Sequence, residues 1–329
     1  MVLPHVKDRF TKITDMKSLC EIFKGQTIPI YMPGGNKGDG LIYFGAKNLF
    51  KQYDIIPNEI VNLPNWYRSL LNKQNKENNR FQQTITQNKK FIRGIRIKPK
   101  DAKNKKNPNI NHNNLLRKDL LPKALFVYGC GGYCNIHHSM PERLAYFLNK
   151  FDEIYILPSS FECSYQIVGD FISNLPDYIM VFCREKYSYQ QVKNKTRFPE
   201  NVRIDHDTAL FGNYDSFITE NSSGKIISLR QDLEKNRDWN LGNNVVDLSA
   251  GGNHTNFMNL LNEIKKYKIV VTDRAHVSIV ATMLKKEVHI LPNNYHKVKG
   301  IYEYSLKDKP NIHFYENVDE INNLIKSLI

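Results

Sequence analysis

The sequence predicts an α/β protein with two Rossmann-like domains whose parallel sheets face a cleft. First, short apolar runs rich in β-branched residues alternate with amphipathic segments of helical period. Second, a polar stretch rich in Asn and Ser, 212–224, separates this alternation into two series. Third, the length of 329 residues suits about two domains. We therefore expect one domain at 1–215 and another at 216–329, with the last helix packing either there or back on the first domain.

The first series starts with a helical lead-in over residues 1–26. The apolar run 28–31 then predicts a strand, which enters a glycine-rich turn and a helix, since Ile42, Ala46 and Leu49 share one helical face. Each later strand of this domain is an apolar run that ends in polar or glycine residues. These strands are predicted at 54–57, 124–128, 154–157, 177–183 and 202–204, with a helix from residue 184.

The second series repeats the pattern after the polar stretch. Its helices are predicted at 254–267, at 277–284 and from residue 318. Its strands are predicted at 225–229, 269–272 and 288–291. Strands that alternate with helices on this scale form parallel sheets with crossover connections, which is the basis for the predicted fold class.

Residues 66–122 interrupt the first series with Asn- and Lys-rich tracts. Between Arg68 and Lys123 lie 16 Lys or Arg and 3 Asp or Glu, so this segment carries +13 of the chain's net charge of +14. We interpret it as a solvated basic insertion, or alternatively as a contact with an anionic surface such as a membrane or a glycan. Too few aromatic residues occur there for base stacking, so nucleic acid is the weaker hypothesis.

The composition indicates where in the cell the protein is expected to act. No run approaches the ~20 apolar residues of a membrane-spanning helix. The charged N-terminus lacks the apolar core of a secretory signal, and the odd count of 5 cysteines is typical of reduced thiols. We therefore expect a cytoplasmic protein, peripheral at a membrane if the insertion contacts one. Cys130 and Cys134 have no matching pair at zinc-site spacing, and no metal or organic cofactor is expected.

Polar and glycine residues at the predicted carboxyl ends of strands are the candidate site residues, because open parallel sheets bind ligands there. In the first domain these are Gly34, Gly35, Asn36, Asp39, Gly131, Arg184 and Asp207. In the second domain they are Arg230, Arg274, His276 and Lys297. Some have structural alternatives: Asp39 could cap the following helix, Arg184 could bridge loops, and Lys297 could be solvated.

The segment 273–276 joins a predicted strand to a predicted helix. Arg274 and His276 thus lie beside a helix N-terminus, whose dipole favours an anion. A guanidinium there suits phosphate or carboxylate, and an imidazole can give or take a proton near neutral pH. Arg230 is a second candidate for binding an anion. The structural alternatives are that His276 caps its helix and that the arginines form ion pairs with neighbouring aspartates or Glu234.

Several short motifs follow one another in a characteristic order and spacing, and together they cover most of the chain outside 66–122. They are GGNKGD (34–39), the loop GCGG (129–132), CREKYS (183–188), HDTA (206–209), LRQD (229–232), TDRAH (272–276) and NYHK (294–297). Together they resemble the polysaccharide pyruvyl transferase family. One position departs from the family pattern, because Ala275 stands where Leu is common; this trims an apolar contact and leaves Arg274 and His276 in place.

The resemblance implies a two-domain fold like that of GT-B glycosyltransferases. It also implies transfer of a pyruvyl group from phosphoenolpyruvate to a glycan or an activated sugar, usually as a ketal across two hydroxyls. Arg230 and Arg274 would then bind the two anionic groups of phosphoenolpyruvate, and His276 would move a proton, as acid or as base. The first-domain loops would hold the acceptor. Two alternatives stay open: a glycosyltransferase that uses a nucleotide sugar, and a non-catalytic binding protein that acts through the basic insertion.

Overall fold

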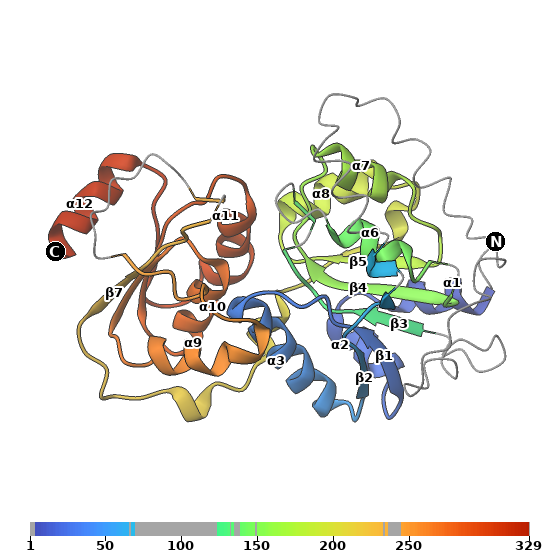
Figure 1. The fold of residues 1–329 in the computed structure, drawn as a ribbon, viewed down its shortest axis with the longest axis horizontal. Coiled ribbons are helices and arrows are strands. Elements are labelled where there is room, and N and C mark those ends of the chain that lie inside the picture. Colours follow the sequence, from blue (N-terminus) through green and yellow to red (C-terminus); the bar gives the residue numbers. More distant parts are fainter. Residues whose placement is uncertain are drawn as a thin grey trace.

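The computed structural model describes residues 4–65, 67–69, 124–131, 133–134, 139–148, 150–232, 234–235 and 245–328. Two lobes lie side by side, and each is built around one parallel sheet (Figure 1). This arrangement confirms the predicted α/β class with two parallel sheets.

Six strands of the described chain form the first sheet, in the order β2-β1-β3-β4-β5-β6, and all neighbours are parallel. They are β1 (Thr27–Tyr31), β2 (Ile56–Ile60), β3 (Ala124–Val127), β4 (Glu153–Ser159), β5 (Ile179–Cys183) and β6 (Val202–Ile204). The helices are α1 (Pro4–Lys12), α2 (Met16–Ile22), α3 (Lys37–Gln52), α6 (Ser139–Ala145), α7 (Gln166–Ser173) and α8 (Lys186–Lys195), with short turns η4 (Pro199–Asn201), η5 (Thr208–Phe211) and η6 (Asp215–Phe217). Because β2 and β3 flank β1 on opposite sides, the chain reverses its direction across the sheet between β1 and β3. Such a switch point is where open α/β sheets bind ligands.

Four strands of the described chain form the second sheet, in the order β10-β9-β8-β7, again with parallel neighbours. They are β7 (Lys225–Ser228), β8 (Ile269–Thr272), β9 (Glu287–Ile290) and β10 (Ile312–Phe314). The helical elements are η7 (His254–Asn256), α9 (Phe257–Ile264), α10 (Ala275–Met283), α11 (Lys297–Ile301), the π-helical turn η8 (Tyr302–Leu306) and α12 (Val318–Leu328). The chain passes from one sheet to the other through 205–224, which contains the polar stretch.

Helices cover both faces of the first sheet, and its strands are therefore buried on both sides. Successive residues of β3 alternate between two hydrophobic cores, because side chains of a strand point to opposite faces. Phe126 packs in one core with Leu19 of α2. Leu125 and Val127 pack in the other core with Val168 of α7.

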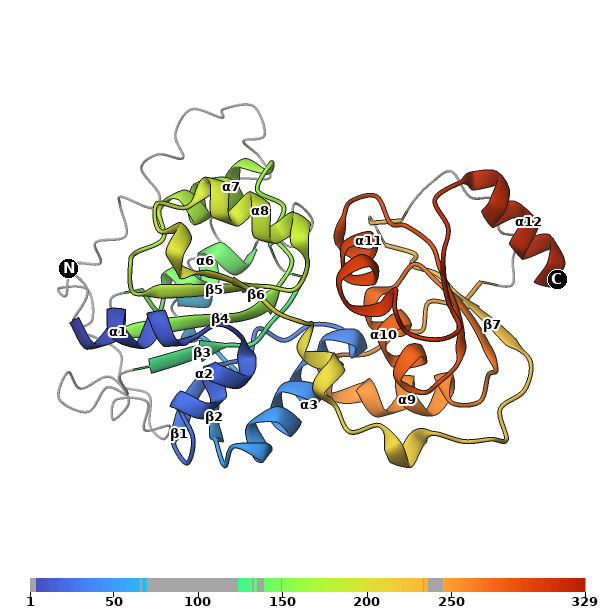
Figure 2. The ribbon, with the colours of Figure 1, turned by 180° about the vertical axis from the view of Figure 1, so that it is seen from behind.

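Helix α3 joins the two lobes (Figures 1 and 2). Ile42 belongs to the core of the first domain, whereas its neighbour Leu41 is buried in the core of the second. The ring of Phe44 lies 5.3 Å from the ring of Phe257 at the start of α9. A methyl group on Gly40 would lie 2.8 Å from the Phe257 Cβ, so only glycine permits this close approach of the helix. The relative position of the lobes thus depends on α3.

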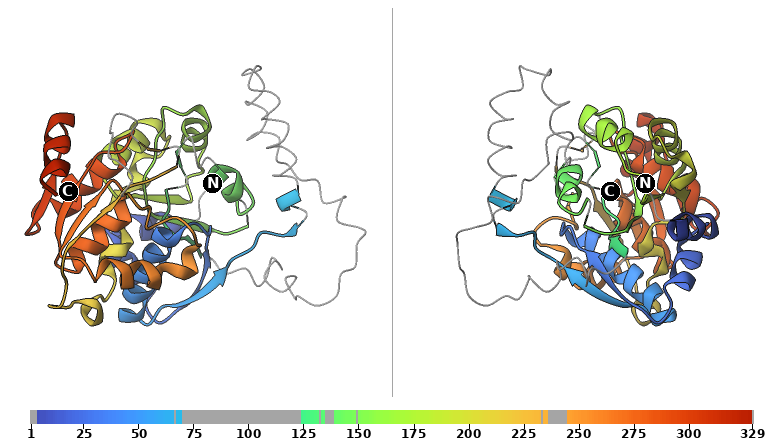
Figure 3. Two further views of the ribbon diagram at one scale, coloured as in Figure 1. Left: turned by 60° about the vertical axis from the view of Figure 1, so that its left-hand side comes forward. Right: turned by 90° about the vertical axis from the view of Figure 1, so that its right-hand side faces the viewer.

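The C-terminal helix α12 packs on the second sheet, so the alternative that it returns to the first domain is wrong. Ile321 shares a hydrophobic cluster with Ile227, Val271 and Leu291, which come from the second sheet and its strand ends. The side view shows α12, in red, at the margin of the second lobe (Figure 3). The apolar face of α12 therefore packs within the second domain.

Some predicted boundaries shift by a few residues. Strand β2 starts at Ile56, because Asp54 has a φ of 54° and turns the chain before the strand. Helix α8 starts at Lys186, with Glu185 as its N-cap, so Arg184 stands free of the helix. The predicted helix 254–267 consists of the turn η7 followed by α9.

The basic insertion 66–122 lies outside the described residues, apart from 67–69. Its interpretation as a solvated segment or a contact with an anionic surface stays a prediction. Within the described ranges, no helix combines the length and the apolar character needed to cross a membrane.

Candidate active site

A cavity of about 310 Å³ lies between the lobes, beyond the carboxyl ends of strands from both sheets. It is lined by Pro33, Gly34, Gly35, Asn36, Asp39, Cys130, Gly131, Ser139, Met140, Arg143, Arg184, Arg230, Glu234, Ser249, Arg274, Ala275, His276 and Lys297. Every candidate named from the sequence lines this cavity except Asp207. That residue is fully buried and contacts the lining residues Arg184 and His276. The two sheets thus bring the predicted residues together.

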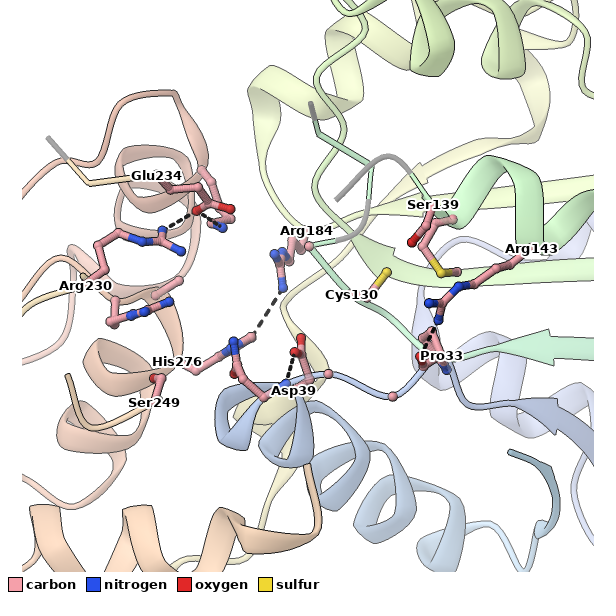
Figure 4. A pocket seen from close by; sticks show the side chains of 18 residues that line it. Pro33, Asp39, Cys130, Ser139, Arg143, Arg184, Arg230, Glu234, Ser249 and His276 are labelled. Atoms are coloured by element: carbon pink, nitrogen blue, oxygen red, sulfur yellow. Dashed lines mark hydrogen bonds and ion pairs between the residues drawn. The ribbon is translucent and has the colours of Figure 1, made fainter. Parts of the chain in front are cut away.

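His276 lies in the first turn of α10, and its Nε2 atom faces the first domain (Figure 4). Nε2 is 3.5 Å from Asp207 Oδ2 and 3.4 Å from Arg184 Nη1. When Nε2 carries a proton, Asp207 is its acceptor, and when Nε2 is bare, Arg184 is its donor. Both protonation states of Nε2 therefore have a partner, which suits a group that gives and takes a proton.

Asp207 and Arg184 form a buried ion pair behind His276. Arg184 Nη1 donates to Asp207 Oδ2 at 2.7 Å, and Arg184 Nε donates to the Ser160 hydroxyl at 2.8 Å. Asp207 Oδ1 accepts from the backbone N–H of Ala209 at 2.9 Å. Burial opposes ionisation of Asp207, but Arg184 and then His276 hold its pKa well below the usual range. Asp207 is therefore a carboxylate at neutral pH and orients both neighbours.

Arg230 and Arg274 follow neighbouring strands and share one carboxylate. Arg230 Nε donates to Asp232 Oδ1 at 2.9 Å, and Arg274 Nη2 lies 2.9 Å from Asp232 Oδ2. Arg230 also pairs with Glu234, and Arg274 also pairs with Asp247. Both pairs considered for Arg230 are thus present, whereas Arg274 pairs with Asp232 and Asp247 and not with Asp273. Both arginines still line the cavity. The Asp232 side chain is 39% exposed, so it is the shared partner that a ligand could replace.

Asp273 lies behind this pair of arginines. Its Oδ1 accepts from the backbone N–H of Arg230 at 2.8 Å, which ties the end of β7 to the end of β8. Burial raises the pKa of Asp273 to about 6, although Arg230 and Arg274 oppose the rise. The Asp273 carboxyl group therefore gains or loses its proton at a pH a little below neutral.

Lys297, at the start of α11, is buried in the cavity wall. Its Nζ donates to Glu234 Oε2 at 2.7 Å, so Glu234 pairs with both Lys297 and Arg230. Burial lowers the pKa of Lys297, and Glu234 partly offsets that effect. A methyl group on Gly131 would lie 3.7 Å from the Lys297 Nζ atom. The loop after β3 thus approaches the second domain at this point.

The glycine-rich loop after β1 forms the opposite wall. Asn36 Oδ1 accepts from the backbone N–H of Gly38 at 2.7 Å, and Asp39 Oδ2 accepts from the backbone N–H of Asn36 at 2.9 Å. This reciprocal capping box is the structural role that the sequence left open for Asp39, which also lines the cavity. Gly34 and Gly35 have φ angles of 84° and 125°, which glycine adopts without strain.

The N-termini of α3 and α10 meet at this wall. A methyl group on Gly38 would lie 2.6 Å from His276 Nδ1, which is closer than real carbon contacts. Glycine at position 38 therefore allows the imidazole to reach α3. Both helix N-termini carry partial positive charge, which adds to the attraction of the cavity for an anion.

Sequence reasoning missed four polar lining residues as site residues: Ser139, Arg143, Glu234 and Ser249. Glu234 and Ser249 lie in the connection after β7, several residues beyond the strand end. Ser139 and Arg143 belong to α6, whose position over the loop after β1 depends on the crossover that follows β3. Their spacing of four residues places both on one helical face, which is the signal that could have paired them.

Comparison with known families identifies the family of the chain. The model of the family described as polysaccharide pyruvyl transferase matches residues 36–295. The chain belongs to the polysaccharide pyruvyl transferase family. The resemblance based on the motifs is thereby confirmed, and family membership supports a transferase. No curated protein matches the sequence of this family member.

Three solved structures are similar to this pyruvyl transferase family member to different degrees. An uncharacterized protein from Klebsiella pneumoniae is similar over 96% of this chain and 100% of its own, with a TM-score of 0.61 and 20% identity. UDP-GlcNAc 2-epimerase from Neisseria meningitidis, bound to UDP-GlcNAc, is similar over 92% and 91%, with a TM-score of 0.43 and 11% identity. The S. aureus MnaA–UDP structure is similar over 92% and 97%, with a TM-score of 0.42 and 12% identity. The Klebsiella protein supports the fold alone.

Proposed function

We propose that the protein transfers a pyruvyl group from phosphoenolpyruvate to two hydroxyls of a glycan or an activated sugar, with formation of a ketal and release of phosphate. The observation that carries this proposal is the convergence of His276, Arg230 and Arg274 on one cavity in a chain of this family. Phosphoenolpyruvate carries a phosphate and a carboxylate, and the two arginines offer a guanidinium group to each.

The reaction adds two acceptor oxygens to C2 of phosphoenolpyruvate. One hydroxyl oxygen bonds to C2 while the methylene carbon takes a proton and becomes a methyl group. The bond between C2 and the phosphate oxygen then breaks, and phosphate leaves with the electron pair. The second hydroxyl oxygen bonds to C2 and closes the ketal. Of the two hydroxyl protons, one ends on the methyl group and the other on phosphate.

His276 moves a proton in this scheme, as the base for an acceptor hydroxyl or as the acid for the methylene carbon. Its Nε2 has a partner in either protonation state, Asp207 or Arg184. The Asp207 carboxylate stabilises the charged imidazolium and fixes the ring, so Asp207 acts as a positioning residue. These steps use only the side chains and the two substrates, and we propose no metal or organic cofactor.

Donor binding would displace the Asp232 carboxylate from the two arginines. Asp232 bridges Arg230 and Arg274 and is partly exposed, whereas Glu234 and Asp247 are buried partners of the same arginines. An incoming anionic group of phosphoenolpyruvate would take the place of Asp232 and leave the buried pairs intact. The arginines would thereby stay fixed in position before the donor arrives.

The test is phosphate release from phosphoenolpyruvate with a panel of mono- and oligosaccharides and their phosphorylated forms. We expect release only when an acceptor is present, together with a new methyl signal of a ketal in the product. His276→Gln should abolish release without loss of folding, and His313→Gln, at an exposed site in β10, is the matched control. Thermal protection by a nucleotide sugar but not by phosphoenolpyruvate would instead favour a glycosyltransferase.

A further inference from the structure

One cation in the cavity differs from the others in its partners. Four cationic side chains have a carboxylate within ion-pair distance: Arg184, Arg230, Arg274 and Lys297. Arg143 has no carboxylate at that distance among the described residues. Its Nη1 donates to the carbonyl oxygen of Pro33 at 2.7 Å, and its charge acts on the nearby Tyr31 hydroxyl. Both groups are neutral, because burial raises the pKa of Tyr31 above its usual value.

The guanidinium charge of Arg143 therefore has no ion-pair partner among the described residues. Of those residues, five cations line the cavity, and the other four pair with Asp207, Asp232, Glu234 and Asp247. The carboxylate of Asp39 also lines the cavity, but it accepts from the Asn36 backbone in the capping box of α3. An anion that binds at a paired arginine must compete with the existing carboxylate. An anion at Arg143 meets no such competitor in the described part of the chain and gains the charge-assisted interaction.

Arg143 stands apart from the proposed donor site. Figure 4 shows Arg184 in the middle of the cavity, with Arg230 and Glu234 on one side and with Cys130, Ser139 and Arg143 on the other. Ser139 lines the cavity from the same face of α6, one helical turn before Arg143. Both residues lie over the glycine-rich loop, at the switch point of the first sheet between β1 and β3.

We propose that Arg143 and Ser139 form a second anion subsite, which binds a phosphoryl or carboxylate group carried by the acceptor. This inference rests on the proposed function, in which Arg230 and Arg274 bind the donor. It identifies the acceptor as an anionic sugar rather than a neutral one, with its charged group against the wall of the first domain and its reacting hydroxyls toward His276. The guanidinium of Arg143 pairs with the anion, and the Ser139 hydroxyl donates a hydrogen bond to it.

The test measures binding separately from turnover. By calorimetry, N-acetylglucosamine 1-phosphate, glucuronate, N-acetylglucosamine and phosphoenolpyruvate are titrated into the full-length protein and its variants. Wild type should bind the phosphorylated sugar or the uronate at least 10-fold more tightly than N-acetylglucosamine. Arg143→Gln should weaken the binding of that anionic sugar by about 10-fold or more, and it should leave the affinity for phosphoenolpyruvate within about twofold of wild type. Arg274→Gln should do the reverse.

Three further variants control for displacement of the loop, because Arg143 also holds Pro33. Ser139→Ala leaves that contact intact and should weaken the binding of the anionic sugar by about threefold to 10-fold. Arg143→Lys keeps the charge and should retain part of the affinity. Arg197→Gln, at an exposed arginine that does not line the cavity, should change nothing.

Two results would overturn the subsite. One is that Arg143→Gln weakens phosphoenolpyruvate as much as the anionic sugar, because Arg143 would then belong to the donor site. The other is that wild type binds charged and neutral sugars equally. Failure of the proposed function looks different, because the anionic sugar would bind in an Arg143-dependent way while no sugar in the panel elicits phosphate release.

Discussion

Asp207 Oδ2 lies 3.5 Å from His276 Nε2, although the two residues come from different domains. The same oxygen accepts from Arg184 at 2.7 Å, so one buried carboxylate links the ion pair of the first domain to the imidazole of the second. Geometry of this kind requires both lobes in their observed position. The activity should therefore depend on Asp207 through His276.

We expect Asp207→Asn to lower the rate of phosphate release by about 100-fold or more, because an amide cannot stabilise the imidazolium. Groups that act as one unit are not additive, so the double variant with His276→Gln should lose little more than His276→Gln alone. Rates are measured below the unfolding temperature of each variant, since Arg184 without its carboxylate costs about 3–5 kcal/mol of stability. Fully additive losses would show that Asp207 acts independently of His276.

The pH dependence of stability should reveal Asp273. Its pKa is raised to about 6 in the folded state, from about 3.8 in the unfolded chain, so the folded protein binds the proton more tightly. The contribution of Asp273 to the free energy of unfolding therefore falls as the pH rises from about 4 to about 6, by at most about 3 kcal/mol.

Asp273→Asn should remove this dependence, because the amide keeps an acceptor for the Arg230 backbone N–H and carries no charge. Urea unfolding at pH 4, 5, 6 and 8 measures the difference in free energy of unfolding between variant and wild type. That difference should favour the variant increasingly up to pH 6 and then level off. A difference that is the same at every pH would contradict the assignment.

Asp232→Asn should improve donor binding. The variant removes the shared charge between Arg230 and Arg274, while Glu234 and Asp247 stay in place. We expect the KM for phosphoenolpyruvate to fall by about threefold to 10-fold, with kcat changed less. Asp215→Asn, at an exposed aspartate that does not line the cavity, is the control. A KM that rises would mean that Asp232 helps to orient the arginines instead of competing for them.

Gly40→Ala should destabilise the protein, although alanine normally favours a helix interior by about 0.5–1 kcal/mol. The added methyl group would collide with Phe257 and the His254 backbone in the second domain. We expect a loss of about 1–3 kcal/mol in urea unfolding and a wider separation of the lobes in solution scattering. Lys51→Ala, on the exposed side of α3, should stay within about 0.5 kcal/mol of wild type. Stabilisation by Gly40→Ala would contradict the close packing of α3.

Much of the fold and the site could be predicted because both depend on local patterns. Apolar runs such as 124–128 and 269–272 identify strands, and the residues after them lie at strand ends by construction, which is why Arg230, Arg274 and His276 converge. Their partners are a matter of tertiary packing. That Asp247 would pair with Arg274, or Glu234 with Lys297, depends on how the connection after β7 folds back, and no periodicity records this.

Arg143 illustrates the second limit of sequence reasoning. It follows no strand directly. The lack of a carboxylate beside it among the described residues is a property of the assembled cavity, which a local pattern does not contain. Asp39 illustrates the third, because one side chain serves two roles, as a cap of α3 and as part of the cavity wall. A local signal for one role does not argue against the other.

Leu41 is contributed by the first half of the chain and completes the hydrophobic core of the second. A fragment that starts after the polar stretch 212–224 would therefore lack part of its own interior and would not be an autonomous folding unit. The converse holds for the first half, which would expose Leu41 and Phe44 to water once the other half is removed. A chimaera that takes one α/β unit from a relative would therefore have to match the residues that α3 contacts across the boundary, Leu41 and Phe44 included.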